Sequence, residues 1–136
     1  MRKFLAIVAG AIAAMLIVAA FEAFSSFLYP LPELESDDYA SLASVVANMP
    51  LLAKLLVVAG WLVGPLGGVW LALRISDWRW SGWIAVVIVL AGSIANIVIL
   101  PHPLWMQACA IVFPLLGGWI GIRLHPKPYP GEPLLG

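Results

Sequence analysis

The sequence predicts an all-α membrane protein in which four transmembrane helices form two hairpins. The first observation is the length of four apolar stretches, which run over 4–28, 51–73, 83–100 and 104–122. A bilayer core about 30 Å thick needs about 20 apolar residues of helix to cross it. The second observation is composition, because 63% of the 136 residues are hydrophobic, 10% are charged and the mean hydropathy is +1.03. A soluble protein of this size would lack the polar residues to cover its surface, so lipid is the expected solvent.

The first stretch begins like a secretory signal, since Arg2 and Lys3 precede an apolar run. This run continues without a break to Phe21, and no clear A-x-A cleavage site comes before Glu22. We therefore expect an uncleaved first helix.

The connection after the first stretch has a helical pattern of its own. Ser36 suits a helix N-cap, and Asp37 and Asp38 suit the first turn of that helix. Apolar residues then recur at helical spacing before Pro50, at Tyr39, Leu42, Val46 and Met49. Two interpretations remain open, a short amphipathic helix on the outer surface and an ordinary loop with one helical turn.

The second and fourth stretches end alike. Residues 65–74 read PLGGVWLALR and residues 114–123 read PLLGGWIGIR, with five of ten positions identical. The first and third stretches both end in a Pro-x-Pro sequence, at 30–32 and 101–103. We therefore expect a 1–124 transmembrane domain whose hairpins, 4–74 and 82–123, are related by a pseudo-twofold axis along the membrane normal. Residues 125–136 predict a proline-rich cytoplasmic tail.

Glycines at a spacing of four predict close helix packing. The pairs Gly60 and Gly64, Gly64 and Gly68, and Gly117 and Gly121 each form a G-x-x-x-G pattern. We expect the second and fourth helices to form the tight core. The same faces also fit a homo-oligomer or a larger membrane complex, and the pattern does not decide between contacts within one chain and contacts between chains.

Positive charges predict the orientation. If the N-terminus is cytoplasmic, the cytoplasmic side holds six of the seven Lys and Arg residues, and only Lys54 lies outside. Cytoplasmic loops carry an excess of these residues. The expectation is a multi-pass protein of the inner membrane with both termini cytoplasmic and an acidic first loop outside.

Several function classes are disfavoured by the residues present. The formal net charge is zero and no basic cluster occurs, so nucleic acid is not an expected partner. Cys109 is the single cysteine, which excludes an intrachain disulfide and a cysteine-based metal site. No pattern typical of a nucleophile elbow, a zinc peptidase or a phosphate-binding loop is present, and we expect neither a metal nor another cofactor.

Polar residues inside the spans are costly in lipid, and they mark the candidate site. They gather in the predicted outer halves of the helices, so we expect an outward-facing pocket that binds a ligand through Glu22, Ser25, Tyr29, Lys54, Ser93, Asn96, His102 and Gln107. Glu22 and Lys54 lie at similar depth and are expected to form an ion pair. Glu22 has a second interpretation as a protonatable or ligand-binding carboxylate, and His102 either binds a ligand or caps its turn.

A group of short motifs carries a resemblance over most of the chain. These motifs are Glu22, Tyr29-Pro30, Pro50, the 64–68 glycine stretch, Asn96, Pro101-His102-Pro103 and Trp105. The chain resembles an uncharacterised group of small bacterial four-helix membrane proteins, and this resemblance implies that Glu22, Asn96 and His102 belong together. In size and helix count it is also similar to small multidrug-resistance transporters, whose first-helix Glu exchanges protons and cations. Their Glu lies nearer mid-membrane and their charge bias is weaker.

Three functions follow from these features. The first is a non-enzymatic packing or accessory membrane subunit with a small polar pocket at its outer face. The alternative is a small transporter or proton-coupled carrier that uses Glu22. The third is a membrane enzyme in which Glu22 and His102 act as an acid and base pair.

Overall fold

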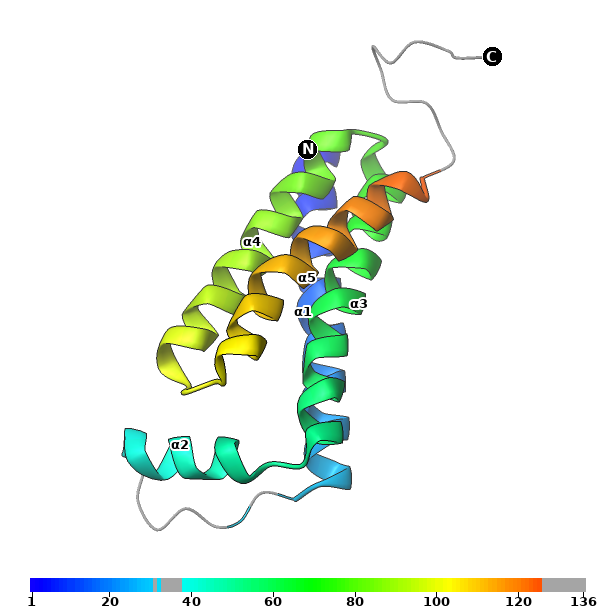
Figure 1. Ribbon diagram of the computed structural model, residues 1–136. Helices are drawn as coiled ribbons and strands as arrows, with labels where there is room; N and C mark the ends of the chain where they lie inside the picture. The colour runs from blue at the N-terminus through cyan, green and yellow to red at the C-terminus, as the bar shows by residue number, and fades with distance from the viewer. Residues whose placement is uncertain (31, 33–37, 126–136) are drawn as a thin grey trace.

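The computed structural model describes residues 1–30, 32 and 38–125, and its regular elements there are all helices (Figure 1). The helices are α1 (Arg2–Leu28), α2 (Tyr39–Asn48), α3 (Leu51–Ser76), α4 (Arg79–Ile99) and α5 (Leu104–Arg123). All except α2 are long and apolar enough to cross a membrane. The four predicted spans are therefore confirmed as helices of the length that a multi-pass membrane protein needs. The predicted proline-rich tail lies outside the described residues after position 125.

The ends of the helices follow from local sequence. Pro50 and Pro103 stand immediately before α3 and α5, where the N–H group that proline lacks would have no helical partner. α3 ends at Ser76, and its C-cap is Asp77, whose φ of 49° lies in the left-handed region that Asp tolerates better than most residues with a Cβ. Asp77 and Trp78 alone connect α3 to α4, so these helices form a tight antiparallel turn.

α3 is the central helix of the bundle. Its backbone approaches those of α1, α4 and α5, and α4 also approaches α1 and α5, whereas the described backbones of α1 and α5 do not come close to each other. A twofold relation between the hairpins would pair the α3–α4 contact with an equivalent contact between α5 and α1. The helix packing lacks this equivalent, and the internal repeat stays a prediction from the sequence.

The glycine stripes are used within the chain. A Cβ atom on Gly68 would lie 2.3 Å from the carbonyl oxygen of Gly10, so this part of α3 is pressed against α1. A Cβ atom on Gly117 would lie 2.2 Å from the carbonyl oxygen of Leu62, so α5 is pressed against the other side of α3. Small residues permit such close approach in lipid. The second and fourth spans, α3 and α5, do pack closely, but the tight core that was expected of these two helices also includes α1, because the α3 glycines face the first span.

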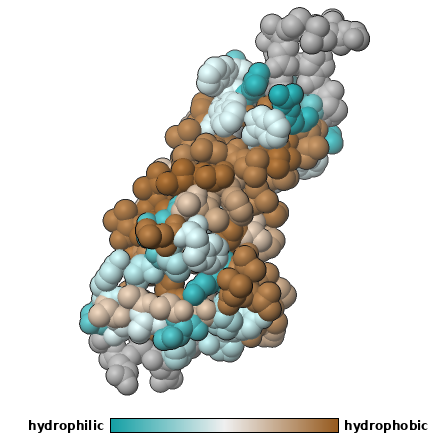
Figure 2. Space-filling model, in the orientation of Figure 1, coloured by the Kyte–Doolittle hydropathy of each residue, from teal (hydrophilic) through white to brown (hydrophobic). Residues whose placement is uncertain are grey.

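The helices are held together differently at their two ends. At the end that holds Arg2 and His125, here called the terminal end, a buried cluster fills the space between helices with Val69, Leu73, Val86 and Ile122. At the other end, here called the α2 end, α4 and α5 lean away from α3 and α2 lies crosswise beneath them (Figure 1). On the face that Figure 2 shows, mostly hydrophobic residues cover the middle of the molecule between two more polar ends.

α2 corrects one detail of the prediction. The connection contains a helix, as one of the two interpretations held, but the helix begins at Tyr39 and its N-cap is Asp38. The Ser41 backbone N–H donates to Asp38 Oδ1 at 3.1 Å. The cap is therefore Asp38 and not the predicted Ser36, since the carboxylate of Asp38 satisfies an N-terminal donor of the helix. Ser36 itself lies outside the described residues. Whether α2 lies on a membrane surface stays a prediction.

A polar cluster at the terminal end joins three segments of the chain. Asp77 Oδ1 lies 3.1 Å from His125 Nε2, and Asp77 Oδ2 lies 4.0 Å from Arg2 Nη2. Arg2 Nε also donates to the carbonyl oxygen of Ile75. The beginning of α1, the α3–α4 turn and the residue that follows α5 are therefore connected.

Candidate functional site

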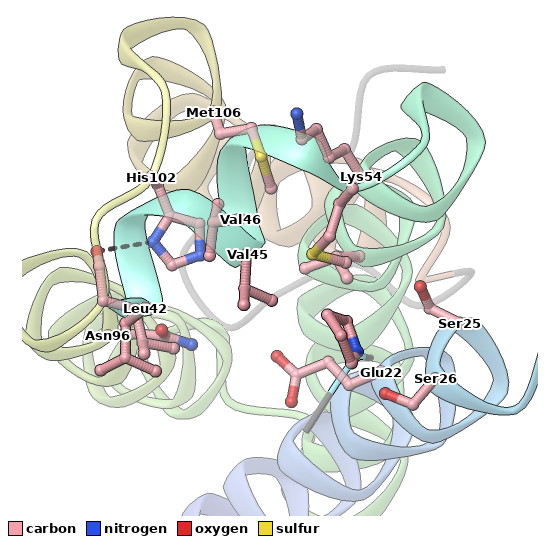
Figure 3. A pocket seen from close by; sticks show the side chains of 14 residues that line it. Glu22, Ser25, Ser26, Leu42, Val45, Val46, Lys54, Asn96, His102 and Met106 are labelled. Carbon is pink, nitrogen blue, oxygen red and sulfur yellow. Dashed lines mark hydrogen bonds between the residues drawn. The ribbon is translucent and has the colours of Figure 1, made fainter. Parts of the chain in front are cut away.

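The α2 end contains a cavity of about 340 Å³ between the two helix pairs. We call it the α2-end cavity, and Figure 3 shows its walls from close by. Every helix contributes to its lining, which comprises Glu22, Ser25, Ser26, Pro32, Leu42, Val45, Val46, Met49, Lys54, Val57, Asn96, Leu100, His102 and Met106. Most of these side chains are apolar, and a few polar groups converge among them, as in many small-molecule sites.

Glu22 projects from α1 into this cavity (Figure 3). It is partly buried, and its carboxylate forms no hydrogen bond or ion pair with any residue that the structure describes. A carboxylate among apolar side chains carries a desolvation cost unless a donor or a cation compensates it. Glu22 is therefore the polar group of the cavity with the greatest need for a partner.

Lys54 does not supply that partner. Its Nζ donates to the carbonyl oxygen of Ala47 at 3.1 Å, and Figure 3 shows the ammonium group directed away from Glu22. The expected ion pair between Glu22 and Lys54 is not formed. The last turn of α2 leaves carbonyl oxygens without helical donors, and the Lys54 ammonium binds one of these.

Asn96 and His102 present further acceptors near Glu22. Asn96 Oδ1 is buried and has no hydrogen-bond partner among the described residues. His102 Nδ1 lies 2.9 Å from the carbonyl oxygen of Leu100, and because a carbonyl only accepts, Nδ1 carries a proton. The other ring nitrogen, Nε2, faces the cavity (Figure 3) and is an acceptor in the neutral ring. The His102 ring also packs edge-on against Trp61, with centroids 5.8 Å apart.

A second cavity of about 250 Å³ adjoins the first between α1 and α4. We call it the α1–α4 cleft. Its lining comprises Met15, Val18, Ala19, Glu22, Trp61, Ile88, Val89, Gly92, Ser93 and Asn96. Glu22 and Asn96 line both cavities, so the two spaces meet at these polar side chains.

The structure brings five of the eight predicted site residues together and places the other three elsewhere. The α2-end cavity brings together five of them, which are Glu22, Ser25, Lys54, Asn96 and His102. Ser93 lines the cleft, and Tyr29 lines a third cavity beside Pro50, which shares Pro32, Val45 and Met49 with the α2-end cavity. Gln107 lines none of these three spaces, and its Nε2 donates to the carbonyl oxygen of His102 at 2.8 Å.

Two of the predicted serines have clear structural contacts. Ser25 Oγ donates to the carbonyl oxygen of Ala53 at 3.0 Å, which fastens α1 to the first turn of α3. Ser93 Oγ donates to the carbonyl oxygen of Val89 at 3.1 Å within α4. Both hydroxyl groups are satisfied inside the protein, which distinguishes them from the Glu22 carboxylate and Asn96 Oδ1.

Sequence reasoning missed the apolar wall of the cavity. Leu42, Val45 and Val46 of α2 cover it from one side together with Met49, the residue that follows α2, and Met106 of α5 lines another side. The signal for α2 was present in the helical spacing of its apolar residues. This spacing identifies an apolar face but does not say which surface the face covers.

The site has a defined chemical character. Three residues that line the α2-end cavity carry hydrogen-bond acceptors, namely the Glu22 carboxylate, Asn96 Oδ1 and, in the neutral ring, His102 Nε2. Such a set is complementary to a ligand that carries donors or positive charge. The described residues contain no group of three His, Cys, Asp or Glu side chains that could hold a metal ion. No family model, curated protein or solved structure matches this chain.

Proposed function

We propose that this chain is a non-enzymatic membrane protein that binds a small ammonium-bearing molecule in the α2-end cavity. The observation that carries the proposal is the Glu22 carboxylate, which points into a largely apolar cavity without a partner among the described residues. A cavity of about 340 Å³ has room for a small organic molecule. The Lys54 ammonium donates to the carbonyl oxygen of Ala47, so the Glu22 carboxyl group is available to a ligand.

We further propose that the cavity faces the outside of the inner membrane. Basic side chains lie over tryptophan rings at the terminal end, with Lys3 at 4.7 Å from the Trp78 centroid and Arg74 at 4.9 Å from that of Trp70. Tryptophan and basic residues are typical of a membrane boundary, and an excess of Lys and Arg is typical of the cytoplasmic side. This supports a cytoplasmic terminal end and an α2 end outside.

An accessory role accords with this architecture. The glycine faces that could bind a partner protein are already covered by helices of the same chain. Gly68 packs against Gly10, and Gly117 packs against Leu62. A partner subunit would therefore meet the lipid-facing apolar side chains, such as Phe4 and Leu16. In that role the cavity holds its ligand within a larger assembly.

A carrier is the second candidate. It is favoured by the position of Glu22, because a carboxylate that lines two cavities can be reached from either. A carrier must also open the terminal half of the bundle. The buried cluster of Val69, Leu73, Val86 and Ile122 fills that half, which makes binding the better supported function.

The binding proposal is tested with benzylamine, a small apolar ammonium compound, on the full chain purified in a mild detergent. Thermal unfolding is followed for wild type and Glu22→Gln, with benzyl alcohol as the uncharged control. A bound ligand raises the unfolding midpoint because it binds only the folded state. We expect benzylamine to raise the midpoint of wild type and to raise that of Glu22→Gln less. An equal rise in the two proteins, or no rise at millimolar benzylamine, would overturn the proposal.

A further inference from the structure

The α1–α4 cleft is open to lipid along the bundle side. Met15 and Ile88 on its two walls are 57% and 42% exposed, although both lie within spans where only lipid surrounds the protein. Gly92 also lines the cleft, and a Cβ atom built on it would meet nothing within 4 Å. The cleft therefore has free space that a hydrocarbon chain can occupy.

The length of the cleft suits an alkyl chain. Met15 and Glu22 are seven positions apart on α1, which corresponds to about 10 Å along the helix axis. Over this distance the α1 wall consists of Met15, Val18 and Ala19, and only its end near α2 is polar. A molecule that lies in the cleft would meet apolar side chains first and the Glu22 carboxylate last.

The polar residues at one end of the cleft determine which head group a ligand can have. Glu22 carries a carboxyl group, Asn96 Oδ1 is a buried acceptor without a partner among the described residues, and both residues line the cleft and the α2-end cavity. An ammonium group supplies the positive charge and the hydrogen-bond donors that these two groups lack. An anionic head group would instead be repelled by Glu22.

We infer that the site takes its ligand laterally from the membrane, and that this ligand is a single-chain amphiphile with an ammonium head group. The head group binds between Glu22 and Asn96, and the alkyl chain lies in the α1–α4 cleft. This inference rests on the proposed binding function and adds the source and the shape of the ligand. A free small amine would need the α2-end cavity alone.

The inference is tested by photolabelling the full chain in phosphatidylcholine vesicles. The probe is dodecylamine with a photoreactive diazirine near the end of its chain, and an analogue with a hydroxyl head group is the control. We expect saturable labelling of peptides that contain Met15 and Ile88, with the hydroxyl analogue needing about tenfold higher concentration. Unlabelled dodecylamine is expected to compete, and ethylamine at the same concentration is not.

Variants separate the head-group site from the chain site. Glu22→Gln is expected to weaken labelling about tenfold, because a charged hydrogen bond is lost. Gly92→Leu fills the cleft and is expected to abolish saturable labelling, and Ala19→Leu on the opposite wall serves the same purpose if Gly92→Leu fails to fold. Ala91→Leu is the matched control, since Ala91 is exposed on the same helix and does not line the cleft.

The outcomes distinguish this inference from the function on which it rests. If benzylamine stabilises the protein through Glu22 but Gly92→Leu is labelled like wild type, the proposed ligand binding is supported and the inferred entry of the ligand from the membrane is refuted. Effective competition by ethylamine would have the same meaning. Equal labelling by the ammonium and hydroxyl probes, or labelling that does not saturate, would overturn the inferred amphiphile.

Discussion

Lys54 Nζ donates to the carbonyl oxygen of Ala47 at 3.1 Å, so the first turn of α3 holds the C-terminal end of α2. This single contact has two consequences. It helps to place α2 over the α2-end cavity, and it turns the Lys54 ammonium away from Glu22 (Figure 3). The carboxylate on α1 is thereby left to bind something else.

The contact between Lys54 and Ala47 predicts that Lys54→Met loosens α2. The substitution keeps an apolar stem of similar length and removes the donor, at a cost of about 1 kcal/mol for an exposed hydrogen bond. Amide hydrogen exchange over 39–48 should become about fivefold faster, whereas exchange in the middle of α3 should not change. Unchanged exchange over 39–48 would show that Lys54 does not hold α2.

Close approach of α5 and α3 predicts that Gly117→Ala is destabilising. A Cβ atom there would lie 2.2 Å from the carbonyl oxygen of Leu62, which is backbone and cannot move without the helix. Forcing the helices apart is expected to cost about 2 kcal/mol of unfolding free energy. Gly92→Ala is the matched control, because its Cβ meets open space and alanine is the better helix former. Denaturation in detergent should rank Gly92→Ala at or above wild type, and equal losses for both variants would contradict the packing described for Gly117.

Asp77 combines a backbone requirement with a side-chain requirement. Its left-handed φ favours Gly, Asn or Asp, and its carboxylate lies beside Arg2 and the His125 side chain, which is 2% exposed. Asp77→Ala should lower the unfolding free energy by about 2 kcal/mol, because it loses both properties. Asp77→Asn should lose less, since Asn tolerates the same φ and retains an acceptor. The order is checked by thermal unfolding, and a variant pair with equal midpoints would refute it.

The spans were predictable because membrane thickness imposes a minimum apolar length, and α1, α3, α4 and α5 satisfy it. Depth along the helices also predicted which polar residues share a cavity, as Glu22, Asn96 and His102 do. The depth of a residue along its helix does not determine the direction in which its side chain points. For this reason the sequence predicts Ser93 in the pocket, whereas it lines the cleft, and it predicts an ion pair between Lys54 and Glu22, whereas Lys54 binds Ala47.

Features that depend on how the helices pack against one another were harder to predict from the sequence. The G-x-x-x-G pattern on α3 predicts close helix packing, but a glycine face does not identify the helix that packs against it. In the structure this face packs against Gly10 and Ala14 of α1. The apolar face of α2 was visible in the spacing of Leu42, Val46 and Met49. This face covers the cavity because Lys54 holds the end of α2 and because α1 and α3 are separated from α4 and α5 at this end. Neither of these two relations can be read from a local sequence pattern.

The central claim is that Glu22 lines a cavity open to the outside of the membrane, and thiol accessibility tests it most directly. In a Cys109→Ala background, Glu22→Cys is compared with Phe24→Cys, whose native side chain is 53% exposed on α1 and does not line the cavity. Intact cells are treated with a charged maleimide that does not cross the membrane, and labelling is measured over time. We predict that Glu22→Cys reacts at least tenfold faster than Phe24→Cys. Equal rates for the two cysteines, or reaction of Glu22→Cys only after the membrane is opened, would contradict the account.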